Sequence, residues 1–457
     1  MELNSEILSL VQKYSVSGPR YTSYPTAPQW NEKVGIEDYQ RFLKKSFPDS
    51  KLPVALYVHI PFCESLCYYC GCNIQITKDH GRSIGYVQSL LKEMESVYQI
   101  LGHKQSLSHI AWGGGTPTFL SLDEISLLQK GTLNYFQLDD DAEVSIEIDP
   151  RVTSYPQLEL LRELGFNRVS LGVQDFEKQV QEAVNRIQPL EQTENMLKFC
   201  RELGFKGINF DLIYGLPHQT LASFEKTIES VIRIRPDRIA LYNYAHLPQM
   251  LSHQKILDVL PRPEADERIR IFSRAFERLT QNGYRTVGMD HFAVEEDELF
   301  KALDKKTLYR NFQGYTIKHG AGMIGIGASA IGEVGDSYFQ NERKPKPYED
   351  LVEAKGLSTF RGVLFTEDDR QRKWIILSLM CQFELKFSDF KEKFGADFEK
   401  DFLAELNQLE GLKSDGLLTQ DSKGLKVTEL GRLFVRNIAM VFDAYLKQSA
   451  VTFSKTV

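Results

Sequence analysis

Three features are missing from the 457-residue sequence, and each excludes a class of protein. No apolar run approaches the roughly 18 residues that a membrane-spanning helix needs. The first residues, MELNSEILSL, hold no basic segment followed by an apolar run, so they do not indicate a signal peptide. An excess of basic residues is also lacking, since the formal net charge is −7, which argues against a general nucleic-acid binder. We therefore expect a cytoplasmic protein that binds neither membrane nor nucleic acid.

Cysteine is scarce, with six residues in the chain, yet Cys63, Cys67, Cys70 and Cys72 lie within ten positions. Cytoplasmic thiols stay reduced, so this grouping indicates metal or redox chemistry rather than disulfides. Thiolates are the ligands of iron–sulfur clusters, and three of them leave one iron of a four-iron cluster open. The alternative is a structural zinc site using all four cysteines. It fits less well, because zinc sites usually combine two cysteine pairs from separate segments.

Short β-branched and aromatic runs alternate with helix-period segments from about residue 52 to 244. The predicted strands are 54–60, 109–112, 143–148, 168–173, 208–213 and 238–244, and the predicted helices between them are 85–101, 122–136, 157–164, 191–203 and 221–234. This alternation is typical of βαβ units in a parallel sheet. Six units are too few to close an eight-stranded barrel, so we expect an α/β fold with an open, partial (β/α)6 barrel of the TIM type.

The pattern changes after the barrel. A helix at 265–281 and a strand at 285–289 precede a glycine-rich stretch, 311–335, that we expect to be irregular. Helices at 367–381, 387–394 and 398–409, a hairpin at 416–427 and a last helix at 430–448 predict a mostly helical, winged-helix-like domain. Residues 17–26, rich in proline, glycine and tyrosine, predict an extended arm. The expected organisation is an N-terminal arm (1–50), a catalytic domain (51–360) and a C-terminal domain (361–457).

Unusual residues collect at the predicted strand ends, where catalytic residues of parallel barrels gather. Gly114, Gly115 and Thr116 follow the second strand, and glycine there lets a ligand approach the backbone closely. Glu147 ends the third strand on the same face as Glu143 and Ser145, and it could accept bonds from ribose hydroxyls; a solvated or ion-paired glutamate is the alternative. Three further polar residues, Gln174, Arg186 and Asp211, lie where a buried polar side chain would be costly unless it is paired. A structural ion pair between Arg186 and Asp211 stays open as an explanation.

The spacing Cys63-x3-Cys67-x2-Cys70 resembles the signature of the radical S-adenosylmethionine (SAM) superfamily. Within it, three segments are similar to the anaerobic coproporphyrinogen-III oxidase family: YVHIPFC (57–63), CGCN (70–73) and the arm GPRYTSYPT (18–26). The similarity extends over essentially the whole chain. It implies an oxidoreductase of haem biosynthesis in which a 5'-deoxyadenosyl radical takes hydrogen from a propionate of coproporphyrinogen III. Loss of carbon dioxide and one electron then leaves a vinyl group, and two such reactions give protoporphyrinogen IX.

The resemblance also assigns site residues. It implies a [4Fe–4S] cluster on Cys63, Cys67 and Cys70, together with two SAM molecules. It implies that the first SAM is bound by Tyr57, Gly114, Glu147, Ala245 and Ile331, and the second by Tyr69, Gly115, Thr116, Gln174, Arg186 and Asp211. Tyr57 is also the catalytic candidate. Ala245 and Ile331 rest only on the motifs NYAHLP (243–248) and GASAI (327–331). Cys72 is expected not to be a ligand.

The same resemblance implies a monomer that receives electrons from a small protein such as flavodoxin or ferredoxin. The substrate carries four carboxylates, and Arg20 in the arm is a candidate to bind one. A haem chaperone of the same radical SAM branch is the alternative function, although that pattern lacks the extra cysteine and the arm. A DNA-binding regulator is disfavoured, because the predicted winged domain carries Asp397, Glu399, Asp401 and Glu405 where phosphates would have to lie.

Overall fold

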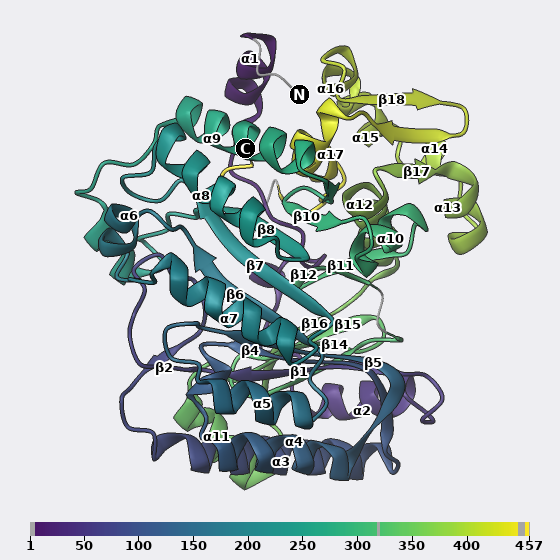
Figure 1. The fold of residues 1–457 in the computed structure, drawn as a ribbon. Helices are drawn as coiled ribbons and strands as arrows, with labels where there is room; N and C mark the ends of the chain where they lie inside the picture. The colour runs from purple at the N-terminus through teal and green to yellow at the C-terminus, as the bar shows by residue number, and fades with distance from the viewer. Residues whose placement is uncertain (1–4, 318–319, 447–452, 457) are drawn as a thin grey trace.

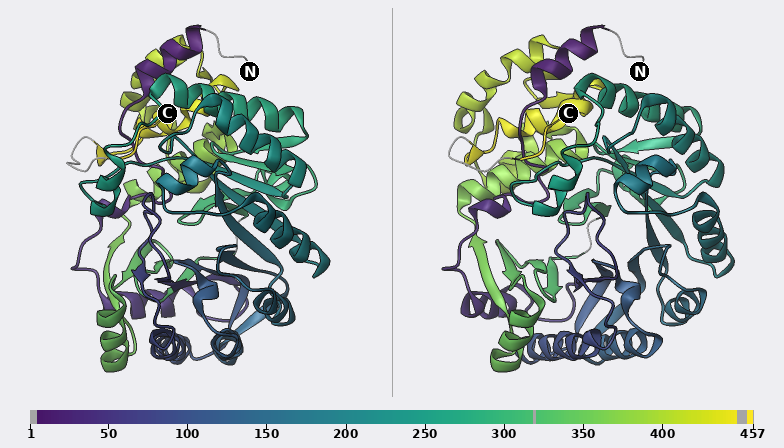
Figure 2. Two further views of the ribbon diagram at one scale, coloured as in Figure 1. Left: turned by 60° about the vertical axis from the view of Figure 1, so that its left-hand side comes forward. Right: turned by 90° about the vertical axis from the view of Figure 1, so that its left-hand side faces the viewer.

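A twelve-stranded sheet forms the centre of the computed structural model, which describes residues 5–317, 320–446 and 453–456. Its strand order is β16-β15-β14-β13-β1-β4-β5-β6-β7-β8-β10-β9. The parallel strands are β1 (Val54–Ile60), β4 (Gln105–Gly114), β5 (Phe136–Ile148), β6 (Arg168–Gln174), β7 (Gly207–Tyr214) and β8 (Arg238–Asn243). The sheet curves around a lumen without closing (Figure 2), so the predicted partial barrel is confirmed.

Helices connect the parallel strands and cover the outer face of the sheet (Figures 1 and 2). They are α3 (Arg82–Leu101), α4 (Leu122–Tyr135), α5 (Tyr155–Glu163), the short α6 (Lys178–Ala183), α7 (Leu190–Glu202) and α8 (Leu221–Ile234). Capping boxes begin α4, α5 and α8, with Ser121, Ser154 and Thr220 as the caps. Of these six connecting helices, α6 is the one that was not predicted, because six residues are too few to show a helical period.

The glycine-rich stretch 311–335 is not irregular, and this prediction was wrong. It contains β12 (Gly314–Ile317), β13 (Met323–Ile326) and β14 (Ile331–Glu333), and β13 pairs in parallel with β1. Strand β13 is buried at all four positions, so it shows no alternation of polar and apolar residues. The sheet is completed on this side by β15 (Ser337–Asn341) and β16 (Thr359–Leu364) and on the other by β10 (His291–Val294) and β9 (Tyr284–Val287).

Shorter elements flank the sheet and form the C-terminal part. The first group is η1 (Ala27–Gln29), β2 (Phe62–Cys63), β3 (Gln75–Ile76), η2 (Pro117–Phe119), η3 (Ser252–Leu257), α9 (Ala265–Gln281), α10 (Glu298–Asp304), β11 (Leu308–Asn311) and α11 (Pro345–Lys355). The second is α12 (Glu367–Leu377), the π-turn η4 (Ser378–Gln382), β17 (Glu384–Lys386), α13 (Phe387–Phe394), α14 (Phe398–Asp401), α15 (Leu403–Gln408), α16 (Glu410–Ser414), β18 (Leu418–Asp421), β19 (Gly424–Val427), η5 (Leu430–Phe434) and α17 (Val435–Met440). Helices with a three-stranded sheet, β17-β19-β18, match the predicted winged domain.

Two C-terminal predictions were too long. The predicted helix 398–409 is interrupted at Phe402, and the predicted helix 430–448 is a 3-10 turn followed by α17, which ends at Met440. Positions 447 and 448 of that prediction lie outside the described residues. Asp443, just beyond α17, accepts a hydrogen bond of 3.0 Å from the hydroxyl of Tyr21 in the arm. The end of α17 is therefore coupled to a partner more than 400 positions away, which helical periodicity cannot reveal.

The N-terminal fifty residues contain two helices that were not predicted, α1 (Ser5–Tyr14) and α2 (Ile36–Ser46). Helix α1 shares a hydrophobic core with the C-terminal helices, beside which it lies in Figure 2. The segment 17–26 between them holds no helix, as expected, but it is not extended throughout, because the backbone bends over residues 22–25 and Tyr21 has a φ of +47°. It is anchored by Arg436, whose guanidinium donates to the carbonyls of Gly18 and Pro19. Within the described part of the chain, no helix has the length and apolarity to cross a membrane.

Candidate functional site

The three cysteines lie on one loop at the carboxyl end of β1. Cys63 ends β2, and the loop after it returns to pair as β3, with the Gln75 amide donating to the Pro61 carbonyl at 2.7 Å. Cys63, Cys67 and Cys70 all line one cavity of about 300 Å³. The ends of β4 to β7 contribute the opposite wall. The strand-to-loop junction thus places three thiols around one space.

The donor set fits a cluster better than a single metal ion. Among the described residues, no three His, Cys, Asp or Glu side chains converge as one ion would require. A cubane cluster bonds each cysteine sulfur to a different iron, so the sulfurs need not meet at a point. The Cys67 sulfur already accepts hydrogen bonds from Arg151 Nη2 at 3.4 Å and Arg186 Nη1 at 3.7 Å, and two cationic donors suit a thiolate ligand.

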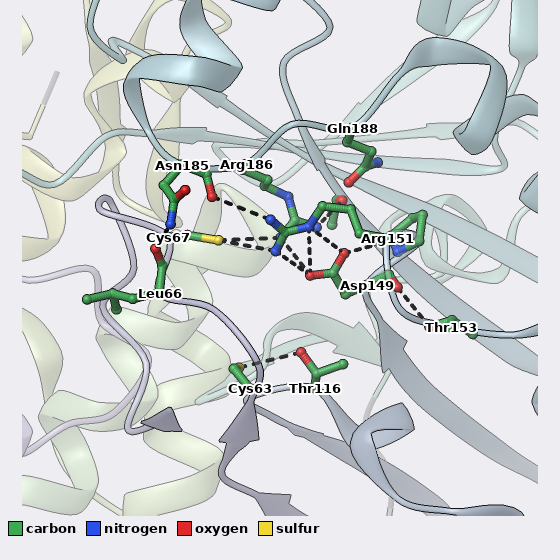
Figure 3. A network of polar contacts seen from close by, with 12 residues as sticks. Cys63, Leu66, Cys67, Thr116, Asp149, Arg151, Thr153, Asn185, Arg186 and Gln188 are labelled. Carbon is green, nitrogen blue, oxygen red and sulfur yellow. Dashed lines mark hydrogen bonds and ion pairs between the residues drawn. The ribbon is translucent and has the colours of Figure 1, made fainter. Parts of the chain in front are cut away.

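Figure 3 shows how these two arginines are held. Both donate to Asp149, from Arg151 Nη2 at 2.6 Å and from Arg186 Nη1 at 3.0 Å, and Arg186 also donates to the carbonyl of Gly172 at 2.6 Å. Burial alone would raise the pKa of Asp149, but the guanidinium groups of Arg186 and Arg151 hold it below its usual value. Asp149 is therefore an anion that fixes two cations beside Cys67.

The Arg186–Asp211 ion pair considered from the sequence is not what holds Asp211. Its carboxylate accepts hydrogen bonds from Ser170 Oγ and from Asn209 Nδ2, both at 2.9 Å. Burial raises the pKa of Asp211. Asp211 lines the same cavity as the cysteines.

The glycine run is required by close packing on the cysteine strand. Gly114 has a φ of +114°, and a Cβ there would lie 2.6 Å from the His59 ring. A Cβ at Gly115 would lie 2.7 Å from the backbone of Pro61 and Phe62. The Gly115 amide donates to the Ile60 carbonyl at 2.8 Å, and Thr116 Oγ1 lies 3.5 Å from Cys63 Sγ. The loop is thus fixed against the cysteine-bearing segment.

Glu147 faces the cavity from the end of β5. Its Oε2 accepts a hydrogen bond of 3.1 Å from the Gly114 amide. Glu143, Ser145 and Glu147 line the same lumen, so the predicted shared face is confirmed. Burial, with a contribution from the nearby charge of Asp211, raises the pKa of Glu147 to about 7, and the Gly114 amide opposes that shift.

The structure gathers most of the residues expected to bind SAM. Those that line the 300 Å³ cavity with the three cysteines are Tyr69, Gly114, Gly115, Thr116, Glu147, Gln174, Arg186 and Asp211. Tyr57, Ala245 and Ile331 do not line it. Tyr57 pairs in register with Gly325, against whose Cα the Ile331 backbone packs, and its hydroxyl lies 3.1 Å from His59 Nδ1. For these three residues, SAM binding remains a prediction.

Contacts of Gln254 and His253 connect the loop after β8 to the cysteine loop. Nε2 of the buried Gln254 donates to the carbonyls of both Tyr69, at 3.1 Å, and Ala245, at 3.3 Å. His253 Nε2 lies 2.8 Å from the carbonyl of Cys70. The loop after β8 therefore packs directly on the cysteine loop.

Among the lining residues that sequence reasoning missed are Asp149, Arg151, Ser170 and Tyr242. Asp149 and Arg151 directly follow β5 in the run Asp-Pro-Arg, and their position at a strand end was a usable signal. Ser170 and Tyr242 lie within β6 and β8, where one polar side chain among apolar neighbours carries little information. Only the curvature of the sheet turns them toward the lumen.

A second cavity of about 160 Å³ lies deeper in the barrel and shares Glu147, Ser170, Asp211 and Tyr242 with the first. Ion pairs close its floor: Arg168 bonds Glu143 at 2.7 Å and Glu298 at 2.9 Å, and Arg238 bonds Asp297 at 2.7 Å. Arg168 and Arg238 begin β6 and β8, so this is the amino-terminal end of the barrel. The lumen is therefore polar, and ion pairs close it at the amino-terminal end of the strands.

Comparison with known proteins agrees with this geometry. The radical SAM superfamily profile matches residues 57–231, and the HemN C-terminal domain profile matches residues 365–434. Fold and site together define a radical SAM protein. The chain is 45% identical over 439 residues to the oxygen-independent coproporphyrinogen III oxidase of Pseudomonas aeruginosa, covering 96% of this chain and 95% of the relative. Identity to the Escherichia coli protein of the same name is 44% over 444 residues, covering 97% and 96%.

The solved structure of coproporphyrinogen III oxidase (HemN) from E. coli, described as a radical SAM enzyme, superposes with a TM-score of 0.91 at 41% identity and covers 96% of this chain and 99% of that one. The chain belongs to the oxygen-independent coproporphyrinogen III oxidase family. The resemblance inferred from the cysteine loop and the arm is thereby confirmed. Membership makes the chain a radical SAM oxidoreductase and implies a [4Fe–4S] cluster and SAM.

Proposed function

We propose that this chain converts coproporphyrinogen III to protoporphyrinogen IX without oxygen, by oxidative decarboxylation of two propionate side chains to vinyl groups. The observation that carries the proposal is one cavity lined by three cysteines, the glycine loop and Glu147, in a chain 45% identical over nearly its whole length to a protein named for that reaction. Each propionate loses one hydrogen atom, one electron and carbon dioxide, and the vinyl group remains.

In this proposal Cys63, Cys67 and Cys70 hold the cluster. With SAM bound, the cluster would supply the radical chemistry for removing a hydrogen atom from the propionate. Arg151 and Arg186 direct cationic N–H groups at the Cys67 sulfur and thereby stabilise negative charge there. Asp149 holds both arginines in place.

The first SAM is assigned to Tyr57, Gly114, Glu147, Ala245 and Ile331, and the second to Tyr69, Gly115, Thr116, Gln174, Arg186 and Asp211. The glycine loop supports the assignment, because its backbone can approach a ligand without steric hindrance. Glu147 supports it as well, because a carboxylate that lines the cavity and accepts from one backbone amide has acceptor capacity left for ribose hydroxyls. Tyr57 keeps the catalytic assignment that the family resemblance gives it, and its hydroxyl lies 3.1 Å from His59 Nδ1.

The arm and the C-terminal domain are proposed to close the barrel opening, with the chain divided into an arm (1–50), a catalytic domain (51–360) and a C-terminal domain (361–457). A covered site excludes water and protects a reactive radical. The packing of α1 with the C-terminal helices supports a closed arrangement. We further propose a cytoplasmic monomer reduced by a small electron-transfer protein such as flavodoxin or ferredoxin. The haem-chaperone alternative is not favoured, since the chain carries both Cys72 and the arm.

The test is an anaerobic assay of the reconstituted protein with SAM, a reductant and coproporphyrinogen III. Protoporphyrinogen IX, carbon dioxide and 5'-deoxyadenosine should form together, and omission of SAM should abolish all three. Haem binding without any SAM cleavage in the presence of coproporphyrinogen III would instead favour the chaperone.

A further inference from the structure

A separate, cationic cavity lies at the rim of the barrel. It has a volume of about 60 Å³ and is bordered by Tyr214 and Asn243, the last residues of β7 and β8. Three arginines from three different parts of the chain line it: Arg20 from the arm, Arg268 from α9 and Arg436 from α17. The cavity therefore exists only when the arm and the C-terminal domain are packed on the barrel.

Positive charge is in excess around this cavity. A fourth guanidinium, that of Arg310, lies beside it and donates from Nε to the Arg20 carbonyl at 3.2 Å. Among the described residues that line the cavity, Asp290 alone is acidic. Its carboxylate lies 3.4 Å from Arg20 Nη2 and is shared with His291, whose Nδ1 is 2.7 Å away. One carboxylate thus faces several guanidinium groups, and an additional anion would be attracted there.

Several arginine N–H donors around the cavity also have no hydrogen-bond acceptor in the described part of the chain. Within the described residues, Arg20 Nε, Arg268 Nε and Arg310 Nη1 are buried without a hydrogen-bond partner. Buried donors normally find a partner, and each unsatisfied one costs roughly 1–3 kcal/mol. The charge excess and the unsatisfied donors are independent observations, and both indicate a missing acceptor that carries negative charge.

Arg436 has a different part in this arrangement. Its donors go to backbone carbonyls, including those of Pro19 at 3.0 Å and Lys455 at 2.8 Å. Burial, together with the charges of Arg20 and Arg310, lowers the pKa of Arg436 to about 9. Arg436 is therefore a positioning residue that fixes the arm and so presents Arg20, while Arg20 and Arg268 keep donors free.

The cavity adjoins the proposed catalytic site. The guanidinium carbon of Arg20 lies 5.4 Å from the centre of the Tyr242 ring. Tyr242 in turn lines both cavities of the lumen. A ligand group bound by Arg20 thus lies one aromatic side chain away from the space that holds the cysteines. This is the arrangement needed for a group that anchors the substrate and does not itself react.

We propose that Arg20 and Arg268 form a carboxylate subsite that binds a propionate of the tetrapyrrole other than the one undergoing reaction. The inference rests on the proposed function for the identity of the ligand. Arginine presents paired donors that match the two oxygens of a carboxylate. A cavity of about 60 Å³ admits the end of a propionate, whereas the macrocycle must remain on the lumen side.

The test compares Arg268→Gln with the matched control Arg270→Gln in the reconstituted holoenzyme. Arg270 is an exposed residue of the same helix and does not line the cavity. Loss of a charge-assisted bond predicts a KM for coproporphyrinogen III raised about 10- to 100-fold in Arg268→Gln. The control should keep the wild-type KM. Arg20→Gln should raise KM similarly, and Arg268→Lys should recover only part of the loss because lysine lacks the planar fork.

A modified substrate makes the test independent of any folding defect. Esterification of the two propionates that the product retains should raise KM for the wild-type enzyme. It should have little further effect in Arg268→Gln, because ester and substitution remove the same contact. Fully additive effects, or an unchanged KM in Arg268→Gln, would overturn the subsite. If wild-type enzyme cleaves SAM but leaves coproporphyrinogen III unchanged, the proposed function itself fails, which is a distinguishable result.

Discussion

Substitution of Gly115 by alanine tests whether the glycine loop is fixed by close packing. The new Cβ would lie 2.7 Å from the backbone of Pro61 and Phe62, whereas ordinary contact begins near 3.4 Å. Backbone cannot rotate away as a side chain can, so the loop must retreat by about 0.7 Å, the difference between these distances. Two backbone hydrogen bonds would lengthen to about 3.5 Å: the one from the Gly115 amide to the Ile60 carbonyl, now 2.8 Å, and the one from the Thr116 amide to the Phe62 carbonyl, now 2.9 Å.

Two weakened hydrogen bonds at about 1 kcal/mol each, with overpacking strain of similar size, predict a stability loss of about 2–4 kcal/mol. Thr116 and Gly114 move with the loop, so affinity for SAM should fall at least about tenfold, because small displacements in a binding site are costly. Stability is measured by urea unfolding of the anaerobically reconstituted protein, and SAM affinity by equilibrium binding.

Gly85→Ala provides the matched control. It lies in helix α3, and a Cβ there meets nothing within 4 Å. Alanine is the better helix former, so this variant should gain about 0.5–1 kcal/mol and bind SAM as the wild type does. If Gly115→Ala proved as stable as Gly85→Ala, with SAM affinity intact, the close-packing explanation of the glycine loop would be refuted.

Three further predictions concern charge and metal ligation. The pKa of Glu147 is raised to about 7, so the accepting carboxylate form is gained as pH rises through 7; SAM affinity should increase from pH 6 to pH 8, and a pH dependence that persists in Glu147→Gln would contradict the assignment. Asp297 is buried and paired with Arg238 and Arg168, so Asp297→Ala should cost about 3–5 kcal/mol, because Arg238 loses this partner while Arg168 keeps Glu143 and Glu298. The exposed Asp304→Ala should change stability by less than about 0.5 kcal/mol. Equal effects of the two substitutions in calorimetry would refute a structural role for these ion pairs. Cys72→Ser should retain the iron content and visible absorbance of the wild type after reconstitution, while Cys63→Ser should lose the cluster; loss of iron in Cys72→Ser would make Cys72 a ligand.

Local sequence determined the barrel strands and the cysteine loop. Strand β1 and helices α8, α9 and α13 have the predicted bounds, because each is a regular apolar pattern with clear ends. The spacing of Cys63, Cys67 and Cys70 indicated a cluster by itself, since the ligands come from one short loop. Side chains toward the carboxyl ends of the parallel strands, such as Glu147 on β5 and Asp211 on β7, were also identifiable, because the carboxyl ends of parallel strands lie at one edge of a sheet.

Tertiary structure decided what depends on contacts between distant segments. Strand β13 was missed because a strand buried on both faces has no polar alternation. Asp443, just after α17, is bonded to the arm through Tyr21, a contact that no local pattern reveals. The partner of Arg186 is Asp149 rather than Asp211, a contact between segments 37 positions apart in the chain. Arg20 could be named as a cation for a carboxylate from the sequence, but Arg268 could not. Nothing in a helical sequence shows that one of its arginines will line a cavity together with an arm more than 240 residues away.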